Sequence, residues 1–251
     1  MANVLQVGSQ EFTAAEVMPL LVNYGLLPQF LREVVIDQAI AAVSCDADEV
    51  VLAQEQFAAR YRLTTPEAVQ SWAASQGMTI EQVTSPSIRA LRLAKFKQAT
   101  WGNRVGSYFL KIKPDLDQVV YSVLRTQNRG LAQELYFRIQ AGEQSFAELA
   151  RTYSQGPEAH TNGLLGPVEL KLCHPVLKPL LMTCQPGQLR PPTRLEEWFV
   201  ILRLEQRIPA QLNDALRQRL LDDLFETWLR EQIIQLQPRL VPDSLSIPVS
   251  A

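Results

Sequence analysis

The side chains of this sequence that could carry acid–base, nucleophilic or metal chemistry are few and scattered. The 251 residues contain two histidines, His160 and His174, and three cysteines. Two histidines cannot make a His-rich metal centre, and the adjacent Cys173 and His174 would direct their side chains apart. Cys173 is better explained as a packed residue than as a nucleophile, because no base lies near it in the sequence. We therefore expect no cofactor and no metal site.

Other catalytic motifs and bulk charge exclude further classes of function. No serine lies in a nucleophile-elbow pattern, and no glycine-rich loop is present to cradle phosphates. The net charge is -2 and the pI is about 5.8, so no basic excess exists to neutralise a nucleic acid. These observations argue against a serine hydrolase, a phosphate-binding protein and a nucleic-acid-binding protein.

The clearest local signals lie between residues 145 and 166. Ser145 and Glu148 form a capping box, which predicts the start of a short helix. Gly163 and Gly166 flank two leucines, a pattern typical of a turn into a strand that passes close to another backbone. These residues predict a helix followed by a glycine-flanked strand.

Further strands are predicted on both sides of that segment. A β-branched, apolar run at 119–124 is typical of a first strand, and an amphipathic helix is predicted at 131–139. A short helix at 175–182 and a Pro-Gly-Gln turn at 186–188 precede a closing apolar strand at 198–205. The predicted order of elements is β-α-α-β-α-β.

This order of features resembles the parvulin family of peptidyl-prolyl cis–trans isomerases over residues 117–207. The resemblance implies an α+β fold, with a small sheet wrapped by helices, and activity on X–Pro bonds. Rotation about such an amide has a barrier of ~18–20 kcal/mol, and no covalent step is needed to lower it. Parvulins are expected to lower it with an apolar proline pocket beneath two histidines and a cysteine or aspartate.

The apolar part of that site has counterparts here. The leucine of the G-x-L-G turn corresponds to Leu165, and the methionine and phenylalanine of the proline pocket correspond to Cys173 and Leu177. The last two are apolar but smaller than the residues that the resemblance implies. The resemblance therefore predicts a substrate-binding surface at these positions.

The polar part of the site is replaced. The histidines of the first and last strands correspond to Val123 and Val200, and the cysteine or aspartate corresponds to Gly156. A threonine before the last strand corresponds to Leu195. We expect Val123 and Val200 to line one concave surface with the apolar positions. The predicted substrate-binding site also includes Gly156 and Leu195 and has no identified catalytic residue.

Two functions follow from this mixture. The first is a peptidyl-prolyl isomerase or foldase acting on X–Pro bonds of polypeptide clients, weak because the paired histidines are absent. The second is a catalytically silent chaperone or adaptor that holds a client on the same scaffold. The retained leucines favour the first and the missing histidines favour the second.

The rest of the sequence predicts a helical module. Residues 1–115 contain several helix starts, including a Thr79–Gln82 capping box after which Pro86 is expected to interrupt the chain. After residue 208, leucines recur at four-residue steps up to Trp228, a stripe that needs a partner surface. We therefore expect the C-terminal helix, within 208–251, to pack on 1–115, with the isomerase-like domain, 116–207, inserted between them.

The sequence says less about the cellular location and the oligomeric state of the protein. The first residues lack the basic and apolar regions of a secretory signal, and no apolar stretch approaches the ~18 residues that span a bilayer. These features favour a soluble, cytoplasmic protein without membrane insertion. The oligomeric state stays open.

Overall fold

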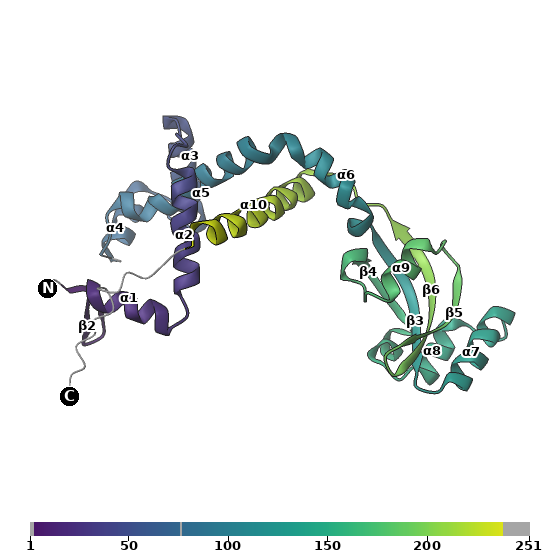
Figure 1. Ribbon diagram of the computed structural model, residues 1–251. Coiled ribbons are helices and arrows are strands. Elements are labelled where there is room, and N and C mark those ends of the chain that lie inside the picture. The colour runs from purple at the N-terminus through teal and green to yellow at the C-terminus, as the bar shows by residue number, and fades with distance from the viewer. Residues whose placement is uncertain (1–2, 76, 238–251) are drawn as a thin grey trace. The chain divides into compact units, whose positions relative to one another are not determined.

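The computed structural model describes residues 3–75 and 77–237. These residues divide into a helical unit, within 1–105 and 217–251, and a sheet unit, 106–216 (Figure 1). The end of the predicted C-terminal segment, 238–251, lies outside the described residues. The boundaries of the sheet unit differ from the predicted ones, which lay at 115/116 and 207/208. The sheet unit begins earlier because it includes almost all of α6, and it ends later because it includes the start of α10.

The helical unit contains a short hairpin and helices from both ends of the chain. Its elements are β1 (Asn3–Val7), β2 (Gln10–Thr13), α1 (Ala14–Asn23), α2 (Leu27–Ile40), α3 (Ala47–Arg60), α4 (Pro66–Ser75), α5 (Ile80–Trp101), η1 (Gly102–Arg104) and most of α10 (Asp214–Leu236).

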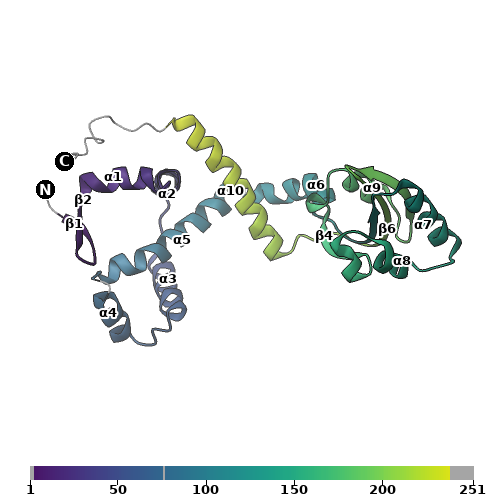
Figure 2. The same cartoon turned by 90° about the horizontal axis from the view of Figure 1, so that it is seen from below.

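The C-terminal helix α10 packs on the N-terminal helices (Figure 2). Phe225, which is 1% exposed, contacts Trp101 with ring centroids 6.1 Å apart. Trp228 lies 5.4 Å from Phe96 of α5, again between ring centroids. An ion pair of 2.5 Å joins Glu226 to Arg32 of α2. The predicted helical module, formed by both ends of the chain, is confirmed.

The sheet unit has a four-stranded antiparallel sheet in the order β4-β3-β6-β5. Its elements are α6 (Val105–Leu116), β3 (Gln118–Thr126), α7 (Arg129–Ala141), α8 (Phe146–Tyr153), η2 (Pro157–Thr161), β4 (Leu164–Glu169), η3 (Leu170–Leu172), α9 (Leu177–Thr183), β5 (Leu189–Leu195) and β6 (Trp198–Ile208). The predicted fold class, a small sheet wrapped by helices, is confirmed.

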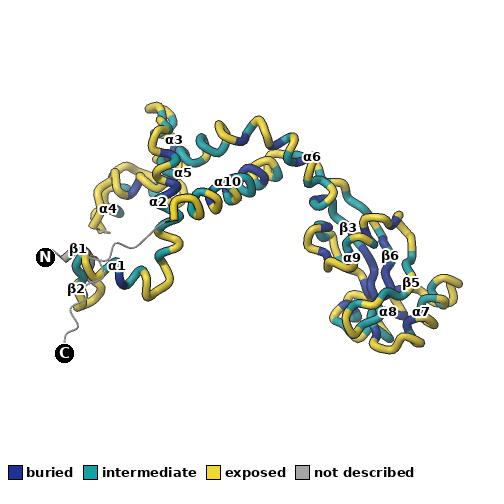
Figure 3. Tube along the Cα trace, viewed as in Figure 1, coloured by how far each residue is buried: buried dark blue, intermediate teal, exposed yellow. Residues whose placement is uncertain are grey.

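Each face of this sheet has its own hydrophobic core. Leu124 and Ile201 pack with Phe146 of α8 on one face, together with residues of α7. On the other face, residues of β3 and β6 pack against η3 and α9. Figure 3 shows that the buried residues concentrate in the central strands β3 and β6. Because side chains alternate along a strand, every second residue of β3 and β6 belongs to the α9 face.

The glycine-flanked turn brings β4 close to β3, as the sequence predicted. Gly166 has φ +110°, and a Cβ at this position would overlap the backbone carbonyl of Val119. Only glycine combines this backbone conformation with so close an approach.

One strand was not predicted, and one local prediction was wrong. Strand β5 has no counterpart in the predicted order of elements, and Pro191 and Pro192 lie inside it. It is an edge strand whose pairing with β6 shifts between Arg190 and Thr193, and an edge position tolerates residues that cannot donate to the ladder. Pro86 does not interrupt the chain, since α5 continues through it.

Candidate functional site

The α9 face of the sheet brings together all of the predicted site residues except Gly156. Val123, Cys173, Leu177 and Val200 are buried in one hydrophobic cluster. Leu165 and Leu195 are partly buried and pack against it. These residues come from β3, β4, β5, β6 and the segment around α9, so only the tertiary fold makes them neighbours.

The two positions that correspond to histidines lie on adjacent strands and on the same face. In the register of β3 and β6, Val123 is opposite Leu202 and Val200 is opposite Arg125. The two valines are therefore diagonal neighbours within one apolar layer. Valine has no polar side-chain atom, so neither position holds a buried polar group that needs a hydrogen-bond partner. If only one histidine of a pair were replaced, the other would lose its partner.

Gly156 lies beside an ion pair, at the edge of the same face. A Cβ on Gly156 would overlap the Nε atom of Arg125 and the Oε2 atom of Glu158. Arg125 donates to Glu158 from Nε at 2.9 Å and from Nη2 at 2.6 Å. Ser154 donates from Oγ to the same carboxylate at 2.5 Å. The space that a side chain at position 156 would need is thus filled by the Arg125–Glu158 salt bridge, whose carboxylate is buried.

The carboxylate of the ion pair is much more deeply buried than the guanidinium. The Glu158 side chain is 2% exposed and the Arg125 side chain 31%. Burial alone would raise the pKa of Glu158, but the hydrogen bonds from Arg125 and Ser154 outweigh it, and the pKa lies below its ordinary value. The hydrogen bonds to Glu158 and its negative charge raise the pKa of Arg125. The pair therefore stays doubly charged at neutral pH.

Two further titratable groups belong to the apolar cluster. Burial raises the pKa of Tyr121 to about 12, and the nearby Cys173 and Glu158 add to the shift. Burial also raises the pKa of the Cys173 thiol, against the opposing charge of Lys178. Both groups are therefore neutral at physiological pH.

The histidines take no part in this face. His160 lies exposed in η2, and His174 is exposed and accepts a hydrogen bond from the backbone N–H of Val176 through Nδ1. Within residues 3–75 and 77–237, no group of three or more histidine, cysteine or acidic side chains is placed to hold a metal ion.

The sequence analysis missed the polar residues of the site. Arg125 was detectable in principle, because the alternation along β3 places it on the face of Tyr121 and Val123. Glu158 was not, since nothing local in the sequence indicates that η2 turns this carboxylate toward β3. Trp198, over whose ring the Arg125 guanidinium lies at 5.8 Å from the centroid, gave no signal beyond its apolar character.

Replacing Gly156 by alanine is expected to destabilise the sheet unit by about 1–3 kcal/mol, because the new Cβ must displace Arg125 or Glu158 from a packed position. Urea unfolding followed by circular dichroism measures the loss. Gly106→Ala in α6 is the matched control, since a Cβ there meets no atom within 4 Å. Equal stability of the two variants would contradict the packing described for Gly156.

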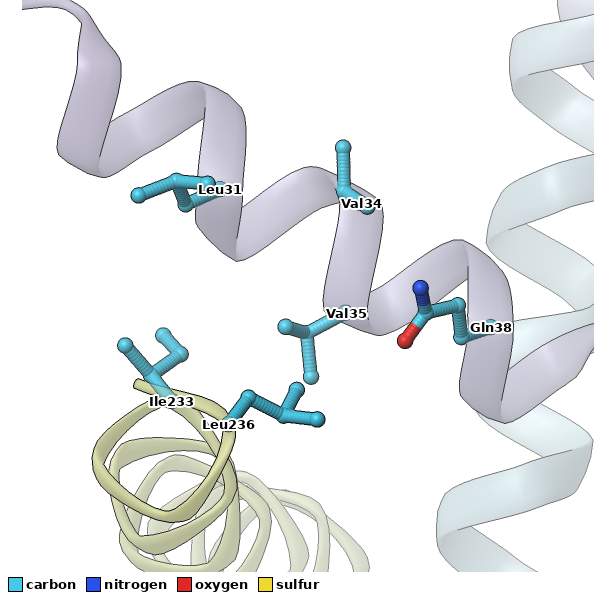
Figure 4. A pocket seen from close by; sticks show the side chains of 6 residues that line it. All are labelled: Leu31, Val34, Val35, Gln38, Ile233 and Leu236. Carbon is cyan, nitrogen blue, oxygen red and sulfur yellow. The ribbon is translucent and has the colours of Figure 1, made fainter. Parts of the chain in front are cut away.

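The helical unit offers a different kind of site. An apolar pocket of about 180 Å³ lies between α2 and α10 (Figure 4). Val35 points into it toward Ile233 and Leu236 of α10. The lining contains one polar side chain, Gln38, so the pocket suits an apolar side chain better than a charged ligand.

Most of the sheet unit is similar to a known protein family. The family described as "Rotamase: PPIC-type PPIASE domain" matches residues 111–206. Chaperone SurA of Pseudomonas fluorescens (strain Pf0-1) is 33% identical over 115 residues, which are 42% of this chain and 27% of the relative. Chaperone SurA of Pseudomonas savastanoi pv. phaseolicola (strain 1448A / Race 6) is 30% identical over the same length and the same shares of both chains. This chain therefore spans about a quarter of the length of the curated relatives that it matches.

A solved structure resembles the whole chain. The peptidylprolyl isomerase PrsA from Bacillus cereus has a TM-score of 0.52 at 17% identity, covering 96% of this chain and 94% of that one. At this identity the likeness concerns the fold alone. Together with the family match, it confirms the parvulin resemblance of the sheet unit.

Proposed function

We propose that this chain, whose residues 111–206 form a PPIC-type peptidyl-prolyl isomerase domain, isomerises X–Pro bonds of polypeptide clients. The observation that supports the proposal best is the apolar cluster around Val123, Leu165 and Val200, assembled from five separate segments at the positions matched to the family. In this function Leu165, Cys173 and Leu177 receive the proline ring. Gly156 and Leu195 belong to the edge of the same binding surface.

The expected rate is well below that of a parvulin with both histidines. Positioned polar groups contribute about 2.7–4 kcal/mol each in a transition state, and the valines at 123 and 200 contribute none. The apolar surface still removes the proline and the reacting amide from water, which favours the less polar, twisted amide.

Leu165→Arg is expected to abolish the acceleration of cis–trans exchange in a short X–Pro peptide, because a charged side chain would replace the partly buried leucine of the proline surface. Exchange NMR on the peptide measures the rate without a coupling protease. Leu164→Arg is the matched control, since Leu164 is the neighbouring residue of β4 and is 49% exposed.

The outcomes separate the two candidate functions. Activity in the wild type and the Leu164→Arg control, lost in Leu165→Arg, would support an isomerase. A wild type without measurable acceleration, but with client binding that Leu165→Arg abolishes, would indicate a silent chaperone on the same scaffold.

The rate is expected to be constant between pH 6 and 8. The pKa of Glu158 lies below 4.5, that of Cys173 above 9.0 and that of Tyr121 at about 12, so none of them changes its protonation state in this interval. A pH series on the same peptide tests this expectation, with a His160→Ala, His174→Ala double variant as control. A bell-shaped profile that the double variant lacks would show that a histidine acts in catalysis.

A holding function for unfolded clients is a second candidate, and the surface of the helical unit favours it. Large apolar side chains are exposed there, among them Tyr24 (68%), Leu26 (42%) and Phe30 (43%). Exposed apolar surface of this kind is typical of sites that bind other proteins. We propose that the helical unit holds polypeptide clients while the sheet unit acts on their prolines.

Some expectations from the sequence stay predictions. Among the described residues, every helix is too short or too polar to span a bilayer. The cytoplasmic location, the preference for proline-containing clients and the absence of nucleic-acid partners rest on the sequence arguments alone.

A further inference from the structure

The three positions where the parvulin resemblance implies polar side chains are all neighbours of one residue in this protein, Arg125. Arg125 is the cross-strand partner of Val200 in the β3–β6 register. It follows Val123 by two residues on β3, so both side chains lie on the same face. Its Nε atom occupies the space next to Gly156 that a larger residue would fill. Arg125 is therefore the charged residue next to the positions at which the resemblance implies polar side chains.

The Arg125 guanidinium is held in place while one of its nitrogens stays unused. Nε and Nη2 donate to the buried Glu158, and the backbone N–H of Arg125 donates to Ser154 Oγ at 3.1 Å. The guanidinium carbon also lies over the Trp198 ring. Nη1 makes no hydrogen bond to any residue that the structure describes, and the side chain is 31% exposed.

A hydrogen bond to an amide can slow or speed rotation about the C–N bond, depending on which amide atom accepts it. Conjugation of the nitrogen lone pair with the carbonyl makes the bond planar and creates the barrier. A donor to the carbonyl oxygen strengthens the conjugated, planar form. A donor to the nitrogen binds the lone pair that becomes available as the bond twists, so it stabilises the transition state more than the ground state.

Arginine suits the second position. It keeps its proton at every physiological pH, and its fork can bind a carboxylate with one side while the other side faces a ligand. A guanidinium fixed by a buried carboxylate needs little reorganisation when the bond twists, which is the condition for electrostatic stabilisation of a transition state. Glu158 and Ser154 meet this condition here.

We propose that Arg125 is a catalytic residue of this isomerase, that its Nη1 donates a hydrogen bond to the imide nitrogen of the X–Pro bond as the bond twists, and that Glu158 positions it. This inference rests on the isomerase function proposed above. In this mechanism a single arginine, which stays protonated at physiological pH, takes the place of the two histidines.

Arg125→Lys is the decisive variant, because lysine keeps the charge for Glu158 but places a single nitrogen there and leaves none in the position of Nη1. We expect kcat for a short X–Pro peptide to fall at least tenfold, with KM changed less than threefold. Exchange NMR at several peptide concentrations gives both constants. Arg138→Lys is the matched control, since Arg138 pairs with Glu134 on α7, which packs on the opposite face of the sheet, and it should keep the wild-type constants.

A second variant tests the positioning role without emptying the buried site. In Glu158→Gln one side-chain oxygen still accepts from Arg125, but the carboxylate fork that fixes the guanidinium is lost. We expect kcat to fall three- to tenfold, and thermal unfolding of each variant confirms that it is folded at the assay temperature.

The failures of the inference and of the proposed function are distinguishable. If the wild type accelerates exchange and Arg125→Lys retains kcat within twofold, the role of Arg125 is wrong and the isomerase function stands. If KM rises tenfold while kcat is unchanged, Arg125 binds the peptide without assisting rotation, which also contradicts the inference. If the wild type itself does not accelerate exchange, the proposed function is wrong and the role of Arg125 with it.

Discussion

Phe225→Ala is expected to lower the free energy of unfolding of the helical unit by about 3–5 kcal/mol, the usual cost of removing a buried phenylalanine side chain. Phe225 is 1% exposed and contacts Trp101 and Trp228, and Lys97 Nζ lies 4.6 Å from its ring centroid. Because α10 is far from α5 in the sequence, the loss weakens a contact between two distant segments of the chain.

Tryptophan fluorescence during urea unfolding measures this effect, because Trp72, Trp101 and Trp228 lie in the helical unit and Trp198 alone lies in the sheet unit. Phe137→Ala is the matched control, since Phe137 lies on α7 and is 56% exposed, and it should change stability by less than about 0.5 kcal/mol. A Phe225→Ala variant as stable as the wild type would show that α10 is not needed for the core of the helical unit.

Arg125→Leu is expected to destabilise the sheet unit by about 3 kcal/mol, the lower end of the range for breaking a buried ion pair. The variant leaves the Glu158 carboxylate, which is 2% exposed, with Ser154 as its remaining side-chain donor. We choose the lower end because the Arg125 side chain is itself 31% exposed and part of its charge is already solvated.

A double-mutant cycle isolates the contribution of the pair. Arg125→Leu combined with Glu158→Leu should recover most of the lost stability, because an apolar pair leaves no uncompensated charge in the interior. The pair of Arg138 with Glu134, whose carboxylate side chain is 61% exposed, is the control, and its removal should cost less than about 0.5 kcal/mol. A double variant as unstable as Arg125→Leu would contradict the ion pair as the cause.

The same pair predicts how stability depends on pH. The pKa of Glu158 is lower in the folded protein than its ordinary value of 4.5, so the folded state favours the charged carboxylate. Its stabilising contribution is therefore present above pH 4.5 and is lost as the pH falls through the folded pKa. In Glu158→Leu this part of the acid dependence should be absent.

Much of the fold followed from local patterns in the sequence. The Ser145–Glu148 capping box begins α8 as predicted, because a cap acts within four residues and needs no distant partner. The apolar runs that became β3 and β6 were found for a similar reason, since a fully buried strand must be apolar on both faces. The stripe from Leu212 to Trp228 likewise showed that α10 needed a partner surface.

Other elements depended on their position in the fold. Pro191 and Pro192 argue against a strand in isolation, and β5 is possible because it lies at the edge of the sheet. Pro86 was expected to break a helix, yet α5 continues through it and packs on α2 and α3. In both cases the tertiary context outweighed a local preference.

Local spacing in the sequence predicted Leu165, Cys173 and Leu177 as apolar site positions, and the structure gathers them in one cluster. The charged residues beside that cluster, in contrast, were found only from the tertiary fold. Arg125 and Glu158 are separated by 33 residues, and their pairing depends on the closeness of η2 to β3 that Gly156 permits. A buried ion pair needs both charges in one place, and no pattern along the chain encodes that distance.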